Sequence, residues 1–200
     1  MATPMSSSQS LSISSGVPLV DGSQYRSIVG ALQYCTLTRP DIAFSVNKAC
    51  QFMHSPTDVH WLAVKRILRY LSGTIDYGLH YQSSADSSVL CYTDADWASC
   101  PSDRRNTNAF CIFHGLNLVS WSSSKQRVVS RSSMESEYRS LANGTAELLW
   151  LQALFSDLQT HCLCLLYYSA TILVFSRNSI EDGWRFLCKL LDQAVIAKGV

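Results

Sequence analysis

The sequence has almost no net charge. Its 16 lysines and arginines are balanced by 15 aspartates and glutamates, which leaves a formal charge of +1 and a pI of about 7.6. This balance excludes a generally basic surface that would attract nucleic acid, and also an acidic composition typical of disorder. A nucleic-acid partner can therefore be inferred only from local patterns.

Patterns typical of secretion and of membrane insertion are also missing. Residues 1–15 are polar and serine-rich, without the basic stretch and apolar core of a signal peptide. The apolar stretch 163–175 contains Ser169 and Thr171 and is shorter than the roughly 20 residues that span a bilayer. We expect a buried strand there. We also expect an intracellular protein, cytoplasmic or nuclear and not secreted, with no membrane partner.

The eight cysteines do not form the pattern of a metal site. Cys162 and Cys164 lie beside His161, but no second ligand pair follows at the spacing of a zinc site. Without a signal peptide, a disulfide framework is not expected either. Small buried thiols are the preferred interpretation.

The first half of the chain is predicted to be helical. Residues 1–22 are rich in Ser, Pro and Gly and are expected to be a linker or disordered. Apolar residues over 23–80 then recur at helical spacing and predict three amphipathic helices. Their apolar positions are Tyr25, Ile28, Val29 and Leu32 in the first, Ile42, Val46, Ala49 and Phe52 in the second, and Val64, Ile67, Leu68 and Leu71 in the third. For the third, Ser55 suits the cap, Pro56 the first turn and Gly73 the stop.

The outer face of the third helix carries Lys65, Arg66 and Arg69. These side chains could bind a phosphate backbone. Three charges on a helix are also typical of a solvated face, so both interpretations stay open.

The second region, 86–159, is predicted to be α/β. Short apolar runs at 89–92, 110–113 and 118–121 predict three strands, the last two joined by a turn at Gly115. A long helix is expected to follow, ending near Gln159, and strands followed by a helix indicate an α/β sandwich. The predicted buried stripe of this helix is Tyr138, Leu141, Ala142, Leu148, Leu149 and Gln152.

Acidic residues mark two positions in this region. Asp94 and Asp96 follow the first strand and share one face if the strand extends that far. Paired carboxylates repel unless a cation lies between them, which favours Mg²⁺, although a turn with capping aspartates fits equally well. At the start of the long helix, Ser132 and Glu135 have capping-box spacing. Glu137 has no such role and is expected to border the buried face.

Four blocks occur in order across these positions. They are Y-T-D-A-D-W-A from Tyr92, D-R-R-N-T-N from Asp103, S-W-S-S-S-K-Q from Ser120 and S-M-E-S-E-Y from Ser133. Their order and spacing resemble the ribonuclease H signature of copia-type retrotransposons, with a plant as the expected source.

Blocks in the first half extend this resemblance. They are Y-R-S-I-V-G-A-L-Q-Y from Tyr25, T-R-P-D-I from Thr38 and H-W-L-A-V-K-R-I-L-R-Y-L from His60. They are similar to the segment that follows the reverse transcriptase polymerase in the same Pol polyproteins. The resemblance covers residues 2–159, so the chain is expected to be an interior fragment whose partners include the rest of the polyprotein.

The resemblance implies a specific chemistry. It implies hydrolysis of RNA in RNA–DNA hybrids by two ions, Mg²⁺ or Mn²⁺, held by carboxylates on the first strand, the first long helix and the fourth strand. Asp94 then corresponds to the first-strand ligand and Glu137 to the helix ligand. Lys125, Arg127 and Arg131 could contact the hybrid's phosphates, with solvated loop charges as the alternative.

The sequence departs from this family after the long helix, where neither the Cys-Asp-Asn motif that ends the fourth strand nor the following His-bearing segment occurs. No Asp or Glu occurs between Gln159 and Val174, so the fourth-strand carboxylate is missing and the metal site should be impaired. No adjacent Asp-Asp pair occurs, so polymerisation by this chain is not expected.

A shifted reading frame would explain the missing carboxylate. The codons of residues 167–175 are compatible with Leu-Leu-Cys-Asp-Asn-Leu-Gly-Val in a shifted frame, if the Ala170 codon ends in G. Residues 160–200 are accordingly a divergent tail that is out of frame under this hypothesis.

The sequence therefore predicts an incomplete ribonuclease H-like mixed sheet with a long helix, preceded by a small all-helical reverse-transcriptase tail. The predicted function is a weak or inactive hybrid endonuclease, and the alternative is a catalytically silent nucleic-acid-binding or non-functional fragment.

Overall fold

The computed structural model describes residues 3–6, 11–97, 103–159 and 166–169. They form a mixed α/β protein, as predicted, and divide into two compact units, one ending at Leu79 and one starting at His80. Cys162 and Cys164, interpreted from the sequence as small buried thiols rather than zinc ligands, lie outside the described residues, as does the tail beyond Ser169.

The first unit contains the three predicted helices and one 3₁₀ turn. They are α1 (Ser23–Cys35), η1 (Pro40–Ile42), α2 (Ala43–Cys50) and α3 (Asp58–Gly73). Their apolar faces meet in a core formed by Tyr25, Val29, Leu32, Ile42, Val46, Ala49, Val64, Ile67 and Tyr70. The helical spacing read from the sequence therefore identified most of this core.

The start of α3 differs from the prediction. The N-cap is Thr57, whose Oγ1 accepts from the backbone N–H of His60 at 3.4 Å, while His60 Nδ1 accepts from the Thr57 N–H at 3.1 Å. This reciprocal pair satisfies two donors at the helix start, which places the cap two residues after the predicted Ser55. Pro56 consequently precedes the helix, and its carbonyl accepts from the N–H of Leu19. The predicted end at Gly73 is confirmed.

Residues 11–22, predicted to be a linker or disordered, hydrogen-bond to the start of α3. The Asp58 N–H donates to the Val17 carbonyl at 3.0 Å, and Asp58 Oδ1 accepts from the Val17 N–H at 2.8 Å. The His60 Nε2 lies 3.0 Å from the Ser12 carbonyl. Most of these contacts use backbone atoms, so hydrophobic periodicity gave no sign of them.

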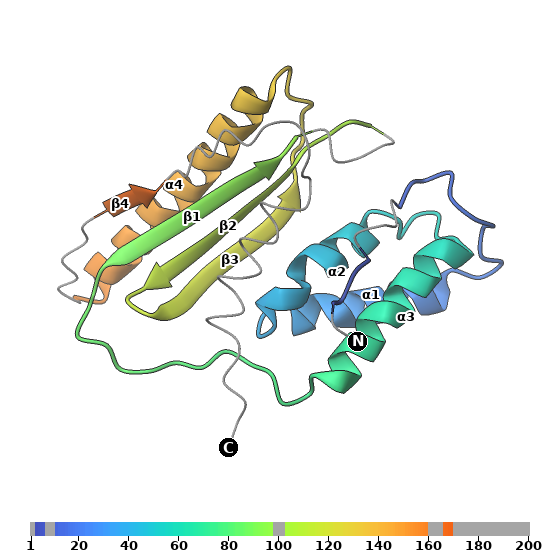
Figure 1. Ribbon diagram of the computed structural model, residues 1–200, viewed down its shortest axis with the longest axis horizontal. Coiled ribbons are helices and arrows are strands. Elements are labelled where there is room, and N and C mark those ends of the chain that lie inside the picture. Colours follow the sequence, from blue (N-terminus) through green and yellow to red (C-terminus); the bar gives the residue numbers. More distant parts are fainter. Residues whose placement is uncertain (1–2, 7–10, 98–102, 160–165, 170–200) are drawn as a thin grey trace. The chain divides into compact units, whose positions relative to one another are not determined.

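The second unit is a sheet with one long helix (Figure 1). Its elements are β1 (Val89–Asp96), β2 (Thr107–His114), β3 (Asn117–Lys125), α4 (Ser133–Asp157) and β4 (Leu166–Ser169). The sheet order is β3-β2-β1-β4, with β1 to β3 antiparallel and β4 parallel to β1. The three predicted strands, the long helix and a strand within 163–175 are all present. Gly115, with φ of +57°, forms the predicted turn between β2 and β3.

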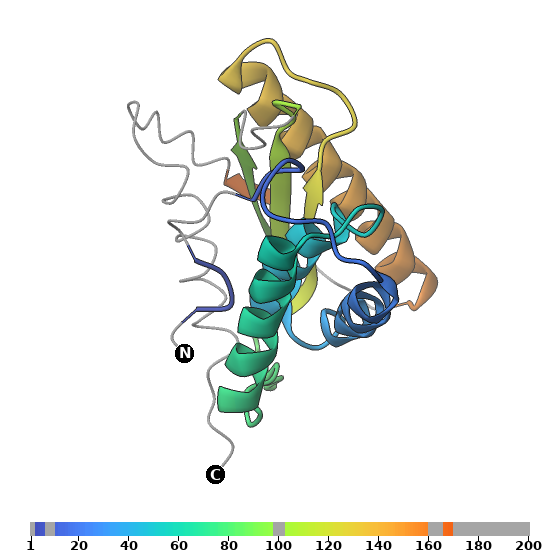
Figure 2. The same ribbon diagram turned by 90° about the vertical axis from the view of Figure 1, so that its right-hand side faces the viewer.

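Helix α4 covers one face of this sheet (Figures 1 and 2). A Cβ added to Gly144 would lie 2.5 Å from Cγ2 of Thr93 and 3.1 Å from Sγ of Cys91. Ser120 Oγ also donates to Glu147 Oε1 at 2.9 Å, which ties the helix to β3. Because side chains alternate along a strand, the side chains of Cys91 and Thr93 lie on the α4 side of β1. The side chain of Asp94 then lies on the opposite side.

The buried stripe of α4 is not the predicted one. The buried residues are Ser136, Ser140, Gly144, Leu148 and Leu151, so Leu148 alone was predicted correctly. Tyr138 and Leu149 are 62% and 57% exposed. The small residues face the sheet because they let the helix approach β1 closely. This close packing determines which side of α4 is buried, and the larger apolar residues Tyr138 and Leu149 therefore stay exposed.

Candidate functional site

The acidic pair of β1 lies on one strand face, as the alternation predicted. The strand extends through Asp96, so the condition for Asp94 and Asp96 to share a face is met. Asp94 is half-buried, and this burial raises the pKa of its carboxyl, with a smaller opposing effect from a hydrogen bond to the Ala95 backbone. A half-buried carboxyl with a raised pKa gains most from a nearby cation.

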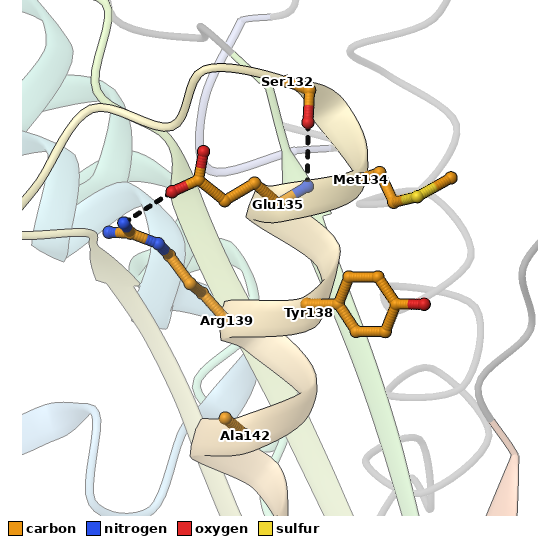
Figure 3. A pocket seen from close by; sticks show the side chains of 6 residues that line it. All are labelled: Ser132, Met134, Glu135, Tyr138, Arg139 and Ala142. Atoms are coloured by element: carbon orange, nitrogen blue, oxygen red, sulfur yellow. Dashed lines mark hydrogen bonds and ion pairs between the residues drawn. The ribbon is translucent and has the colours of Figure 1, made fainter.

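Glu135 takes part in the start of α4, but only half of the capping box that its spacing indicated is formed (Figure 3). Ser132 Oγ accepts from the Glu135 N–H at 3.1 Å and caps α4. The Glu135 carboxylate accepts from the Arg131 N–H at 2.8 Å and pairs with Arg139 at 2.7 Å. The hydrogen bond from the Arg131 N–H holds the pKa of Glu135 below its usual range, and the hydrogen bond and positive charge of Arg139 lower it further. This carboxylate is therefore occupied by the helix start.

Glu137 is exposed, so the prediction that it borders the buried face was wrong. The buried positions are Ser136 and Ser140, and Glu137 turns toward solvent between them. Within the described part of the chain, its carboxylate makes no hydrogen bond or ion pair. Its helix is nevertheless fixed close to Asp94, because Ser140 Oγ donates to the Asp94 carbonyl at 2.7 Å. Glu137 lies three residues before Ser140, on an adjacent part of the helix surface.

The structure therefore holds the part of α4 that carries Glu137 against the backbone of Asp94. It does not bring the two carboxylates together in the same way. The Asp94 side chain lies on the sheet face away from α4, and Glu137 belongs to α4. Among the described residues, no group of three or more His, Cys, Asp or Glu is placed to hold a metal ion. These residues thus do not form a complete site for Mg²⁺, and metal binding by Asp94 and Glu137 stays a prediction.

The basic residues near α4 differ in their surroundings. Lys125 Nζ pairs with Asp103 at 2.8 Å and is mostly buried, so its charge is already compensated. Arg127 and Arg131 are exposed in the connection between β3 and α4. These two arginines are the better placed of the three for a contact with phosphate.

The basic residues of α3 all have intramolecular contacts. Lys65 Nζ lies 5.6 Å from the centre of the Trp61 ring, and Arg69 Nε donates to the Lys65 carbonyl. Arg66 donates to the carbonyl and the hydroxyl of Thr3, at 3.2 and 3.0 Å. These contacts favour the solvated-face interpretation, and phosphate binding by α3 stays a prediction.

A shallow depression of about 430 Å³ lies on the outer surface of α4. It is lined by Ser132, Met134, Glu135, Tyr138, Arg139 and Ala142, and Figure 3 shows Met134 and Tyr138 on the other side of the helix from the Glu135–Arg139 pair. Glu137 lies between the lining residues Glu135 and Tyr138 in the sequence but does not line the depression itself. Among the lining residues, Glu135 is the one carboxylate.

Two polar residues that organise this region were not singled out from the sequence. Ser140 links α4 to β1, and Gln126 is buried against the first turn of α4. A signal for Ser140 was present, because Ser136, Ser140 and Gly144 recur every four residues, which is typical of a helix face in close contact.

The relatives of this chain decide its family. Over 158 residues, or 79% of the chain, the sequence is 48% identical to the retrovirus-related Pol polyprotein from transposon RE2 of Arabidopsis thaliana. The chain belongs to the retrovirus-related Pol polyproteins of transposons. This Pol segment spans 11% of that relative's length. The resemblance to retrotransposon Pol polyproteins is thereby confirmed.

Shorter proteins are also similar to much of this chain. An uncharacterized mitochondrial protein of Arabidopsis thaliana is 50% identical over 153 residues, which are 75% of this chain and 64% of that protein. Secreted RxLR effector protein 161 of Plasmopara viticola is 43% identical over 128 residues, which are 64% of this chain and 90% of that protein. No family model and no solved structure matches the chain. No helix among the described residues of this Pol segment is long and apolar enough to cross a membrane.

Proposed function

We propose that the second unit of this Pol segment is an incomplete ribonuclease H-like domain, and that it hydrolyses RNA in RNA–DNA hybrids weakly or not at all. The first unit would be the helical tail of the reverse transcriptase. The supporting observation is the arrangement of β1, α4 and β4. The family resemblance assigns the metal-binding carboxylates to the first strand, the first long helix and the fourth strand, and here β4 is parallel and adjacent to β1.

The strand arrangement also supports the proposed impairment. Parallel neighbours end at the same sheet edge, and the register pairs Ser169 of β4 with Tyr92, two residues before Asp94. No Asp or Glu occurs in this part of the sequence. The edge where three carboxylates are expected thus receives one of them from β1 and none from β4, which would weaken the binding of Mg²⁺ or Mn²⁺.

Hybrid cleavage tests this proposal. A labelled RNA–DNA hybrid is incubated with Mg²⁺ or Mn²⁺ and either the unaltered chain, Asp94→Asn, Glu137→Gln, or Ser169→Asp, which adds a carboxylate to β4. We expect slow or undetectable cleavage by the unaltered chain, faster cleavage by Ser169→Asp, and loss of that gain when Asp94→Asn is added. Detectable cleavage by the unaltered or the Ser169→Asp chain that is not lowered by Asp94→Asn would contradict the assignment.

A silent nucleic-acid-binding fragment is the second candidate. The exposed Arg127 and Arg131 favour it, because they would contact phosphates whether or not a metal site forms. Hybrid binding that falls in the double variant Arg127→Gln/Arg131→Gln, with no cleavage in any variant including Ser169→Asp, would favour this candidate over the enzyme.

A further inference from the structure

A buried polar network surrounds the start of α4. It consists of Asn106, Gln126, Ser130 and Ser136, each at most 6% exposed. Asn106 precedes β2, Gln126 follows β3, Ser130 lies in the connection and Ser136 belongs to the first turns of α4. The network therefore joins three segments that are separate in the sequence.

The side-chain amide of Gln126 is the centre of this network. Its Nε2 donates to the Ser136 carbonyl at 3.2 Å and reaches the Ser136 hydroxyl at 3.5 Å. Its Oε1 accepts from Asn106 Nδ2 at 3.3 Å and from Ser130 Oγ at 3.2 Å. The backbone N–H of Gln126 also donates to the Asn106 carbonyl at 2.7 Å. An amide is needed here, because the group must donate on one side and accept on the other.

These bonds act on the part of the helix that carries Glu137. Ser136 is held by Gln126, and Ser140 is held by the Asp94 carbonyl. The two anchors lie one helical turn apart on the buried face, and Glu137 lies between them. Fixing both anchors fixes the position and rotation of this turn relative to the end of β1. The side chain of Glu137 itself makes no bond with the described residues that could do so.

We propose that Gln126 is a positioning residue, which holds the Glu137-bearing turn of α4 against the sheet. Buried polar groups that lose their partner cost free energy, so removal of the amide should loosen this turn rather than leave it in place. The anchoring requires only the described contacts. Its catalytic consequence rests on the proposed function, because only a hybrid nuclease would use the placement of Glu137.

Hydrogen exchange tests the anchoring without any need for activity. In Gln126→Met, which keeps the length of the side chain but removes the amide, we expect protection of the amides of residues 130–138 to fall by about tenfold. Protection over 144–157 should be unchanged. Gln152→Met, an exposed glutamine of the same helix, is the matched control and should change neither segment. Equal protection of 130–138 in Gln126→Met and Gln152→Met would overturn the proposal.

A second variant covers the case in which Gln126→Met does not fold. Gln126→Glu retains the shape, but its carboxylate cannot donate to the Ser136 carbonyl, whereas the protonated acid can. After correction for intrinsic exchange rates, protection of 130–138 should rise in this variant as the pH falls, and should not do so in the unaltered chain. If the difference in protection of residues 130–138 between Gln126→Glu and the unaltered chain does not change with pH, the proposed role of the amide is contradicted.

The cleavage assay separates this inference from the proposed function. If the Ser169→Asp chain cleaves hybrid, adding Gln126→Met should lower kcat with little change in KM, because the turn and not the substrate surface is altered. If no variant cleaves, the proposed function fails, while the exchange results still decide whether Gln126 anchors the turn.

Discussion

Replacing Gly144 by alanine should destabilise the second unit, because α4 lies close to β1 at this residue. The added Cβ would lie 2.5 Å from Cγ2 of Thr93 and 3.1 Å from Sγ of Cys91, both side-chain atoms with little freedom to move away. Overpacking of this kind costs about 1–3 kcal/mol. Alanine gains about 1 kcal/mol over glycine in a helix, so we expect a net loss of about 0–2 kcal/mol.

Gly30 in α1 offers a matched control. It also lies within a helix, but a Cβ added there meets no atom within 4 Å. Gly30→Ala should therefore stabilise the first unit by about 0.5–1 kcal/mol, with the opposite sign to Gly144→Ala. Urea unfolding monitored by hydrogen exchange and mass spectrometry reports on the two units separately, which a whole-chain signal does not.

A double-mutant cycle identifies the cause of the Gly144 effect. Adding Thr93→Ala removes the nearest atom, and the coupling between the two changes should be favourable by about 1–2 kcal/mol. A Gly144→Ala chain that gains about 1 kcal/mol, as an open helix position would, refutes the close contact between α4 and β1.

Three further predictions concern single charged or titratable groups. Arg39→Met should cost the first unit about 3–5 kcal/mol in urea unfolding, since it leaves the mostly buried carboxylate of Asp41, which pairs with Arg39 at 2.7 Å, without its cation. Asp94→Asn should stabilise the second unit at pH 7, because burial raises the pKa of the Asp94 carboxyl. The stability that the protonated carboxyl contributes at low pH is lost as the pH rises through that pKa. The difference in stability between the variant and the unaltered chain should therefore shrink toward pH 4, and a difference that does not change with pH would contradict this reasoning. Burial lowers the pKa of His60 from 6.5, so the first unit should lose stability as the pH falls below about 6.5; denaturation midpoints of a His60→Gln chain should show less of this loss.

The local pattern of the sequence determined the elements and the family. Helical spacing identified α1 and α2 together with their buried faces, and period-two alternation placed Asp94 and Asp96 on one face of β1. These features depend on residues within one turn or one strand, so they can be read without a partner. The Pol motifs could be recognised for the same reason, since each is a short continuous block.

Features that depend on a second element were decided by the tertiary structure. The buried side of α4 was predicted from its large apolar residues, but close packing against Cys91 and Thr93 selected the side with Ser140 and Gly144. Because α4 buries this side, Glu137 is exposed.

The hydrogen bonds around Gln126 likewise join groups from separate segments, and no pattern within one segment reveals them. The sequence alone therefore predicted two carboxylates for the candidate site, Asp94 and Glu137, and their role in it stays a prediction. The packing of α4 on the sheet decided where those carboxylates point, because a side chain's direction is fixed only when its helix has chosen the face that it buries.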